Sequence, residues 1–501
     1  MYRRELPGQT KLIFPFNVEL NPESKWVKIA DLIPWDRIEE DYVKHFTSNE
    51  GQIAKPARLA FGALYIQVSE GFTDEQVRTH IQENPHMQYF CGFPSYSAAP
   101  PFDASMMVHF RKRFPAEIIK QIAEEVFGPA ALNEIDVLEP KKKALEEVES
   151  EEDAIEKTVA AKNVTDNNNR GTLILDATCC PQDIRYPTDI GLMNQAREVS
   201  EEIVDKLYDT VAGQYDYKPR TYRQVARKDY LTFAKKRKHT KKSIRKHLRK
   251  QLQYVARDLR IIQDLIDKGA LLTVLSKTLY KKLPVIEEVF RQQKEMYDTK
   301  TNRCDERIVS ISQPHIRPIV RGKEHNSTEF GSKVAIGLVA GYAFITNISW
   351  ENTAEASLLP QAAEQYNSMF GFYPKAIIGD GVYPNRSNRA YCADHNIRLS
   401  GPKLGRKNEE IKQEEARQQY KDGCERNAVE GKFGTTKLKY GLDCIMTKLP
   451  ETSLTMVAMG FFVANMERKL RLLFVPDSPV FVFCYFQLTK RIIAEEYLLA
   501  A

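Results

Sequence analysis

Two short apolar runs, far apart in the chain, each lead into an aspartate. The first is Thr172 to Asp176 (Thr-Leu-Ile-Leu-Asp), and the second is Lys375 to Asp380 (Lys-Ala-Ile-Ile-Gly-Asp). Short runs rich in Leu and Ile are typical of buried central strands. A carboxylate that ends such a strand lies at the edge of the sheet, where open α/β sheets bind ligands. The two runs therefore predict an α/β fold with acidic groups at a sheet edge.

Each aspartate also has an ordinary explanation. A single aspartate at the end of a strand is more often a cap or turn residue than a ligand, and Asp-Gly is a common turn pair. Gly379 and Gly381, however, flank Asp380 and would let a second backbone or a substrate approach closely. The same arrangement on two strands favours a shared role for the two aspartates.

A third acid, Glu430, lies in a polar segment that predicts a helix. At about 100° per residue, Arg426, Glu430 and Lys437 project within about 40° of one another and share one face. An acid between two cations suits a metal ligand beside groups that grip phosphates. The alternative is a surface ion pair worth ~0.2–0.5 kcal/mol. Gly431 and Gly434 each destabilise a helix by ~1 kcal/mol relative to alanine. A helix that only faces solvent gains nothing from them, whereas a helix that packs against DNA needs small residues, so the glycines favour a contact with DNA.

The order of the predicted elements suggests the fold class. The predicted elements are a strand ending at Asp176, helices over about 190–298, a strand at 308–311, a hairpin of 333–339 and 342–349 around Ala340-Gly341, a helix at 353–370, a strand at 375–380, a helix near 387–394, a short strand at 397–399 and a helical region to about 437. Without the helical insertion, this is the order of an RNase H-like α/β fold. Three acids on such a mixed sheet and a flanking helix can hold two divalent metals that drive phosphodiester chemistry on DNA.

Composition shifts predict the domain boundaries. A chain of 501 residues is too long for one core, and an acidic run followed by a polar run separates a helical first part from the strand at Asp176. The predicted divisions are a helical N-terminal domain for DNA binding or dimerisation at 1–135, a charged helix and linker at 136–170, a catalytic domain at 171–475 with a basic helical insertion at about 190–300, and a C-terminal strand or helix at 476–501.

Positive charge is concentrated in the insertion. Residues 220–260 hold 16 Lys and Arg against 2 Asp, although the whole chain is only +6. A solvated charge run is the alternative, but such density favours a polyanion partner with salt-dependent binding. The candidate DNA-contacting residues of this window are Lys235, Lys236, Arg237, Lys238, Lys241, Lys242, Arg245, Lys246 and Arg249. Lys323, His325 and Lys333 are further candidates outside the window.

Several other classes of protein are disfavoured. The 8 cysteines form no C-x-x-C pair, which fits a reducing, cytoplasmic compartment. The chain has no Walker A sequence and no G-x-G-x-x-G, so no nucleotide cofactor is expected. The apolar stretch from Leu454 to Ala464 is too short to span a bilayer, so no membrane partner is expected.

The motifs as a group resemble the DDE transposases of bacterial insertion sequences. The Arg-x3-Glu-x6-Lys spacing from Arg426 to Lys437 is similar to that family's signature, and the blocks starting at Asp176 and Gly379 are similar to its first and second aspartate blocks. Glu329 to Lys333 resembles the strand between them, and residues 26–115 resemble its helical N-terminal domain. Many members carry a Tyr three residues before the Arg, where this chain has Gly423.

The resemblance implies an RNase H-like core and a specific chemistry. It implies cleavage at transposon ends with two Mg²⁺ (or Mn²⁺) ions, and joining of the 3′-hydroxyl to target DNA. By carry-over, Asp176, Asp380 and Glu430 are the metal ligands, with Asp183 and Asp189 as weaker candidates for the first position. The implied partners are double-stranded DNA, as terminal repeats and target, and a second copy of the chain. The alternatives are a metal-dependent nuclease without strand transfer and an inactive DNA-binding derivative.

Overall fold

The computed structural model describes residues 20–47, 51–152, 168–320, 328–402 and 409–474. Two DNA-contact candidates, Lys323 and His325, lie outside these residues, as does the predicted C-terminal element at 476–501.

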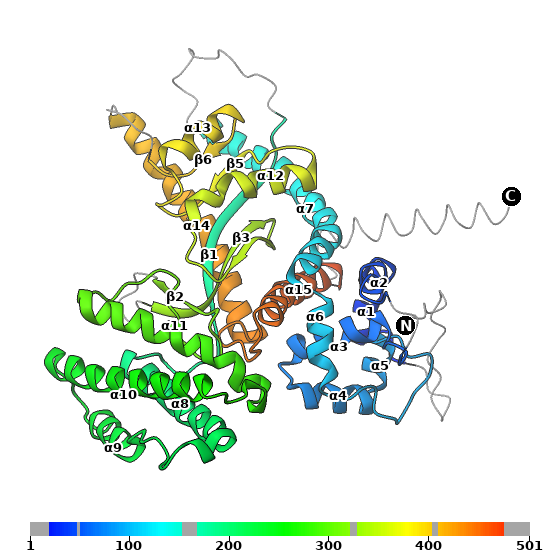
Figure 1. Ribbon diagram of the computed structural model, residues 1–501. Helices are drawn as coiled ribbons and strands as arrows, with labels where there is room; N and C mark the ends of the chain where they lie inside the picture. Colours follow the sequence, from blue (N-terminus) through cyan, green and yellow to red (C-terminus); the bar gives the residue numbers. More distant parts are fainter. Residues whose placement is uncertain (1–19, 48–50, 153–167, 321–327, 403–408, 475–501) are drawn as a thin grey trace. The chain divides into compact units, whose positions relative to one another are not determined.

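The described residues form helices and one mixed sheet (Figure 1). The helices are α1 (Lys25–Ala30), α2 (Trp35–Val43), α3 (Ala57–Glu70), α4 (Asp74–Glu83), α5 (Pro85–Phe90), α6 (Met106–Arg113), α7 (Ala116–Glu152), α8 (Asp189–Val211), α9 (Arg223–Ala234), α10 (Lys241–Asp267), α11 (Lys277–Thr299), α12 (Leu359–Phe370), α13 (Arg386–Asp394), α14 (Glu409–Tyr440) and α15 (Pro450–Phe474), with 3₁₀ turns η1 (Ala212–Gln214), η2 (Leu272–Val274) and η3 (Glu355–Leu358). The strands are β1 (Thr172–Pro181), β2 (Arg317–Val320), β3 (Thr328–Val339), β4 (Tyr342–Ser349), β5 (Ala376–Ile378) and β6 (Arg398–Leu399). The predicted mixed α/β class is therefore confirmed.

The sheet has the order β2-β3-β1-β5-β6, and β4 also pairs with β3. The β1–β5 and β5–β6 pairs are parallel, whereas β2–β3 and β3–β4 are antiparallel. The predicted hairpin is present: Ala340 and Gly341 both have positive φ, 48° and 81°, as a tight two-residue hairpin loop requires. β1 and β5, the strands predicted from the two apolar runs, are neighbours at the centre of the sheet.

Two strand predictions were wrong in detail. β1 does not end at Asp176 but continues to Pro181, so Asp176 lies within the strand. Residues 308–311 form no strand, although Ile308 and Ile311 are buried against the helices of the insertion. The side chain of Gln292 accepts a hydrogen bond from the Ile308 amide (3.0 Å). The apolar side chains are therefore buried among helices, and the Ile308 amide has a hydrogen-bond partner, although the segment pairs with no strand.

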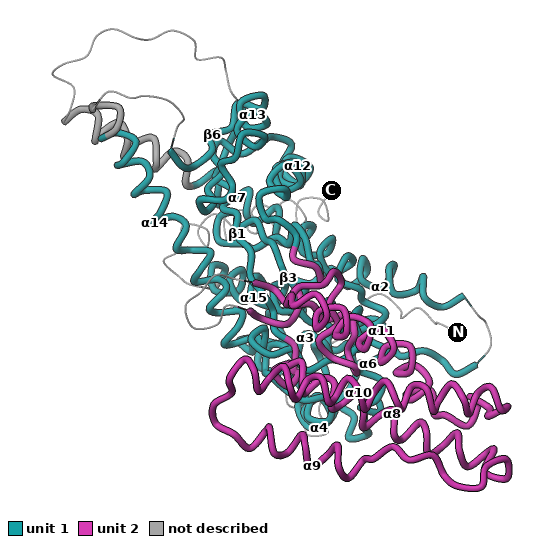
Figure 2. The backbone as a smooth tube through the Cα atoms, turned by 60° about the vertical axis from the view of Figure 1, so that its left-hand side comes forward, with its two compact units in different colours: residues 1–181, 333–349, 353–501 teal, residues 182–332, 350–352 magenta. Residues whose placement is uncertain are grey.

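The chain divides into two compact units (Figure 2). Unit 1 comprises residues 1–181, 333–349 and 353–501, and unit 2 comprises residues 182–332 and 350–352. The described part of unit 1 holds the N-terminal helices, most of the sheet and α12–α15. The described part of unit 2 holds α8–α11, β2 and the first residues of β3. No helix among the described residues is long and apolar enough to cross a membrane.

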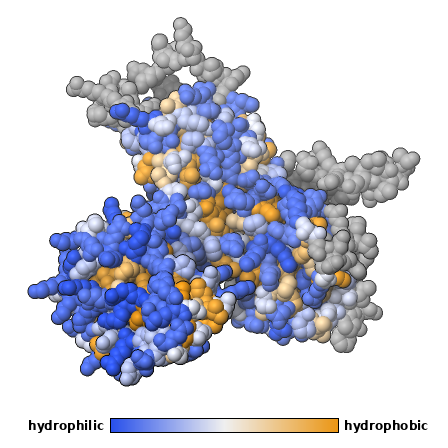
Figure 3. Space-filling model, in the orientation of Figure 1, coloured by the Kyte–Doolittle hydropathy of each residue, from blue (hydrophilic) through white to orange (hydrophobic). Residues whose placement is uncertain are grey.

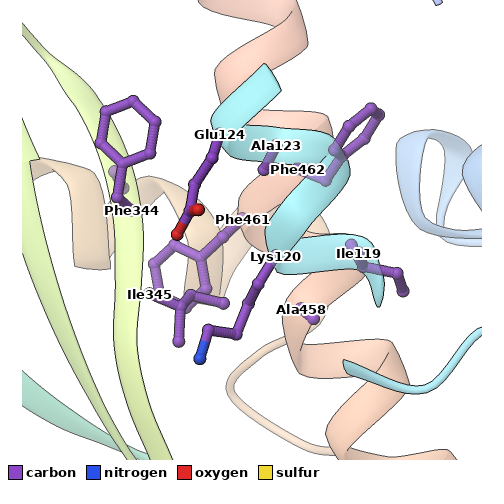
Figure 4. A pocket seen from close by; sticks show the side chains of 10 residues that line it. Ile119, Lys120, Ala123, Glu124, Phe344, Ile345, Ala458, Phe461 and Phe462 are labelled. Atoms are coloured by element: carbon purple, nitrogen blue, oxygen red, sulfur yellow. The ribbon is translucent and has the colours of Figure 1, made fainter. Parts of the chain in front are cut away.

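One hydrophobic core runs through unit 1. It joins residues of the N-terminal helices, such as Phe61 and Phe127, to the sheet and to Phe462 of α15. Figure 4 shows the junction, where Glu124 of α7, Phe344 of β4 and Phe461 of α15 line a small pocket. The N-terminal helices and the sheet of this unit are therefore stabilised by the same buried residues.

Unit 2 is a helical assembly with a polar interior between α8 and α10. α10 buries an apolar stripe that includes Leu248, Leu252 and Val255. Arg197, Glu201 and Asp258 are also buried in this unit. Arg197 donates to the Glu201 carboxylate at 2.5 Å, whereas neither carboxylate oxygen of Asp258 has a hydrogen-bond partner among the described residues.

Candidate active site

The parallel pairing of β1 with β5 brings two of the predicted acids to the same level of the sheet. The pairing aligns Ile174 with Ile378. Asp176 lies two residues beyond Ile174, within β1, and Asp380 lies two residues beyond Ile378, just after β5. Continuing this register places the two aspartates next to each other, at the end of β5 where open α/β sheets bind ligands.

The electrostatics of Asp176 agree with this placement. The pKa of Asp176 is raised to about 6. Burial is the largest cause, and the negative charges of Glu355 and Asp380 act in the same direction, whereas a hydrogen bond from the Ala177 amide (2.8 Å) and the charge of Arg426 lower the pKa. A carboxyl that is half-buried among other acids holds its proton more tightly than usual. A bound cation would relieve this excess of negative charge.

A tight turn holds Asp380. The Val382 amide donates to the Asp380 carboxylate at 3.0 Å, and the Tyr383 amide donates to the Asp380 carbonyl at 3.2 Å. The turn folds the ring of Tyr383 back onto Gly379, where a β-carbon would lie 2.5 Å from the ring atom Cδ2. Gly379 is therefore required by the close approach of a side chain of this chain, a contact that the sequence alone does not show.

Glu355, which the sequence analysis missed, is a further acid of this region. Its carboxylate accepts from the ammonium of Lys333 at 2.9 Å, and the same ammonium donates to the Thr353 carbonyl at 2.9 Å. The side chain of Asn388 donates both to the Ala356 carbonyl (2.8 Å) and to the Tyr383 carbonyl (2.9 Å). This amide ties the turn that holds Glu355 to the turn that holds Asp380.

No local pattern in the sequence could have singled out Glu355. Its segment has the composition of a helix start, and the structure indeed forms η3 and α12 there. The charge of Glu355 acts on Asp176 only in the folded chain, where the Asn388 side chain binds the carbonyl of the next residue, Ala356. A buried amide that bridges two carbonyls cannot be recognised before the fold is known.

Glu430 lies on the exposed side of α14, and its carboxylate accepts from Arg426 at 3.1 Å. Its side chain is 58% exposed, whereas Val429 and Phe433 on the other side of the helix are buried in the core of unit 1. The charge of Arg426 also lowers the pKa of Asp176. Positions 431 and 434 are open: a β-carbon on either glycine would meet nothing within 4 Å.

The donor chemistry at these residues fits a hard divalent cation. Mg²⁺ and Mn²⁺ prefer carboxylate oxygens, which Asp176 and Asp380 supply from adjacent segments. Within the described ranges, no group of three His, Cys, Asp or Glu side chains already has the geometry of a metal site. Glu430 is paired with Arg426 instead, so its approach to the two aspartates stays a prediction.

The weaker candidates for the first ligand both belong to unit 2. Asp189 is the first residue of α8, and its carboxylate accepts from Arg307 at 2.5 Å and Gln293 at 3.1 Å. The carbonyl of Asp183 accepts from Gln313, and this residue lies in the loop after β1.

All nine basic candidates of the insertion are exposed to solvent. They lie on the connection between α9 and α10 and on the first turns of α10, and Figure 3 shows a strongly hydrophilic surface over these helices. α10 is not basic on every face, because Leu248 and Leu252 pack inward. Arg245 lies over the ring of Tyr297, 4.0 Å from its centroid.

Lys333 differs from these candidates. Its side chain is only 11% exposed and is held by Glu355 and by the Thr353 carbonyl. The structure thus places Lys333 as an internal partner of an acid near Asp176, and not on an open surface.

Comparisons with known proteins agree with the motifs. A family model described as a transposase DDE domain matches residues 377–467, which include Asp380 and Glu430. A second, described as a transposase domain (DUF772), matches residues 15–113. The uncharacterised protein ORF8 of the nfe locus of Rhizobium meliloti is 31% identical over 180 residues, which cover 36% of this chain and 72% of that protein. No solved structure matches. The chain belongs to the DDE transposases of insertion sequences.

Proposed function

We propose that this transposase cleaves DNA at transposon ends and joins the freed 3′-hydroxyl to target DNA, in a reaction that depends on Mg²⁺ or Mn²⁺. Asp176, Asp380 and Glu430 are the proposed metal ligands, on an RNase H-like core. One observation carries the proposal: the β1–β5 register brings Asp176 and Asp380 to one level, and Asp176 there has a pKa raised by burial and by neighbouring acids.

Divalent ions on these carboxylates would activate the attacking oxygen and stabilise the leaving oxygen, so no protein nucleophile is needed. The chain's own residues prepare this site. The turn at Gly379 to Tyr383 fixes the Asp380 carboxylate through the Val382 amide. Arg426 pairs with the Glu430 carboxylate, and its guanidinium is a donor group that suits a phosphate.

The exposed basic residues of α9–α10 are the proposed surface for double-stranded DNA. Nine Lys and Arg side chains, none of which faces the core, give a positive patch that neutralises backbone phosphates. Two transposon ends require two active sites, so we propose a homodimer on DNA. Residues 1–135 are proposed as a DNA-binding or dimerisation module, although its helices share the core of unit 1.

The test compares Asp176→Asn, Asp380→Asn and Glu430→Gln with the wild type and with Asp394→Asn, an exposed aspartate of α13. End binding, end cleavage and strand joining are measured on terminal-repeat DNA with and without Mg²⁺. Each of the three variants is expected to bind ends normally and to lose cleavage, while the Asp394 variant cleaves like the wild type. Cleavage retained by any of the three, or abolished together with end binding, would contradict the ligand assignment.

The same assay separates the alternatives. Cleavage without joined products would identify a nuclease that lacks strand transfer. Binding by the wild type without any metal-dependent cleavage would identify an inactive DNA-binding derivative.

A further inference from the structure

The connected ends of α9 and α10 form a basic surface, and the proposed function leaves open which DNA it binds. The two helices lie side by side in unit 2 (Figure 1), and their contacts run in opposite directions along the chain. The Arg257 guanidinium lies over the ring of Tyr222, just before α9 (4.6 Å), whereas Phe233 near the end of α9 lies 5.0 Å from the ring of His247. Residues 235–247 therefore form the closed end of a helical hairpin, the α9–α10 tip.

The α9–α10 tip lies outside the hydrophobic core of unit 2 but has a fixed conformation. The first buried residue of α10 is Leu248, and none of residues 235–247 is buried. The ring of His239 stacks on Phe233 (4.0 Å, 22°), and the Thr240 side chain accepts from a backbone amide in the first turn of α10 (3.2 Å). Because the connection between the helices is held in this way, little conformational freedom is lost when the tip binds a partner.

The charge of the tip is not neutralised within the described part of the chain. Residues 230–257 contain no Asp or Glu. Further from the tip, Lys250 of α10 pairs with Asp229 of α9 (3.0 Å), whereas the Lys and Arg side chains from 235 to 249 have no acidic partner among the described residues. Like charges at this density repel one another, so a polyanion such as the DNA backbone would stabilise the tip.

The side chains of the tip suit phosphates better than base edges. In the major groove, Asn and Gln recognise adenine and Asp and Glu recognise cytosine, and residues 235–250 contain none of these four types. Lysine, a compact charge on a flexible stem, is the commonest residue there. Among the arginines, which can recognise guanine, Arg245 lies over the ring of Tyr297 (4.0 Å). This composition favours contacts with phosphates, which carry no sequence information.

The width of the tip leads to the same conclusion. Two packed helices have axes about 8–10 Å apart and diameters of about 10–12 Å each, so the end of the hairpin is about 20 Å wide. The major groove of B-DNA is only about 12 Å wide. The two helices therefore cannot enter the groove together, and the tip fits across the phosphate backbones that border it.

We propose that the α9–α10 tip is the binding site for target DNA, which it holds through the phosphates without reading the sequence. The inference rests on the proposed function, which requires two kinds of DNA: terminal repeats of defined sequence, and a target. A surface without base-reading side chains binds terminal repeats and other duplexes equally well, so it cannot select the transposon ends. It suits the second kind of DNA.

The test is a variant in which three exposed lysines of the tip, Lys238, Lys241 and Lys242, are replaced with Gln. The matched control replaces three exposed lysines elsewhere in unit 2, Lys206 of α8 and Lys277 and Lys281 of α11, and removes the same charge. Each full-length protein is tested for binding to a random-sequence duplex, for cleavage of terminal-repeat DNA, and for joining of pre-cleaved ends to a plasmid. The unfolding midpoint is measured in parallel.

The tip variant is expected to bind the random-sequence duplex about 10-fold or more weakly than the wild type, and joined products should fall by a similar factor. Its end cleavage and unfolding midpoint should stay at wild-type values, and the control should change none of these quantities. Unchanged binding of the random-sequence duplex, or unchanged joining, would overturn the inference.

Two other results have distinct meanings. A loss of end cleavage as large as the loss of joining would also overturn the inference, because it would assign the tip to the terminal repeats. If the wild type itself neither cleaves nor joins DNA, the proposed function has failed, and the assignment of the tip to target DNA fails with it.

Discussion

Asp258 of α10 gives a prediction whose size follows from the structure of unit 2. Its side chain is fully buried, and neither carboxylate oxygen has a hydrogen-bond partner among the described residues. Burial, and then the charge of Glu201, raise its pKa to about 8. The other charged groups that face it lower the pKa less: Arg197 of α8, Arg257 of α10 and Arg223 of α9. The folded protein therefore keeps this carboxyl protonated at neutral pH.

The sign of the pH dependence follows from this shift. In the unfolded chain the carboxyl ionises near pH 3.9, so between about pH 4 and pH 8 the folded state binds more protons than the unfolded state. The stability supplied by Asp258 is complete below about pH 4, falls by about 1.4 kcal/mol per pH unit above it, and is gone once pH passes about 8. Between about pH 4 and pH 8, the free energy of unfolding therefore falls by at most about 6 kcal/mol through this group. Relaxation of the buried site makes the actual decrease smaller.

Asp258→Asn removes this titration and nearly preserves the side chain's shape. We expect the variant to gain stability over the wild type as pH rises from about 5 to about 8, by up to about 1.4 kcal/mol per unit. Amide hydrogen exchange in α8 and α10, compared between the two proteins at the same pH, measures the gain locally. The control is Asp229→Asn, because the Asp229 carboxylate accepts from Lys250 (3.0 Å) and Tyr254 (2.8 Å). The pKa of the Asp229 carboxyl is lowered, so the difference in stability between Asp229→Asn and the wild type should stay constant above about pH 5. An Asp258→Asn difference that does not grow with pH would refute the reasoning.

Three further predictions concern the site and the basic surface. Replacing Lys241, Lys242 and Arg245 together with Gln should lower the salt dependence of DNA binding. The slope of log K against log salt concentration should fall by about 0.9 for each phosphate that is no longer neutralised. An unchanged slope in a fluorescence anisotropy titration would mean that α10 does not touch the DNA backbone. Lys333→Met should leave that slope unchanged, because its ammonium is held by Glu355 and the Thr353 carbonyl, and a reduced slope would show that it reaches DNA after all. Gly379→Ala should cost about 1–3 kcal/mol in chemical unfolding, because its β-carbon would lie 2.5 Å from the Tyr383 ring, and a neutral result would show that the ring moves freely.

Local sequence signals predicted the parts of the fold that local forces decide. The Ala340-Gly341 pair identified the β3–β4 hairpin, because both positions need positive φ. The apolar run before Asp380 identified β5, and the basic segment was correctly predicted to be helical in α10. These elements depend on neighbouring residues in the chain.

The details that failed depend on tertiary contacts. Whether β1 stops at Asp176 or continues to Pro181 is decided by its sheet neighbours. The run at 308–311 has strand composition, but its side chains pack among helices and Gln292 binds its backbone. The turns that hold Glu355 and Asp380 are tied together only in the folded chain, by the side chain of Asn388.

The proposed chemistry requires that Asp176, Asp380 and Glu430 together hold divalent cations. The most direct measurement is a crystal structure of the protein on transposon-end DNA with Mn²⁺, in which anomalous scattering locates the ions. We expect two peaks about 3.5–4 Å apart, bound by oxygens of all three side chains, with Glu430 released from its pairing with Arg426. Ions bound away from these residues, or a Glu430 that stays on Arg426 while the aspartates alone hold the metal, would contradict it.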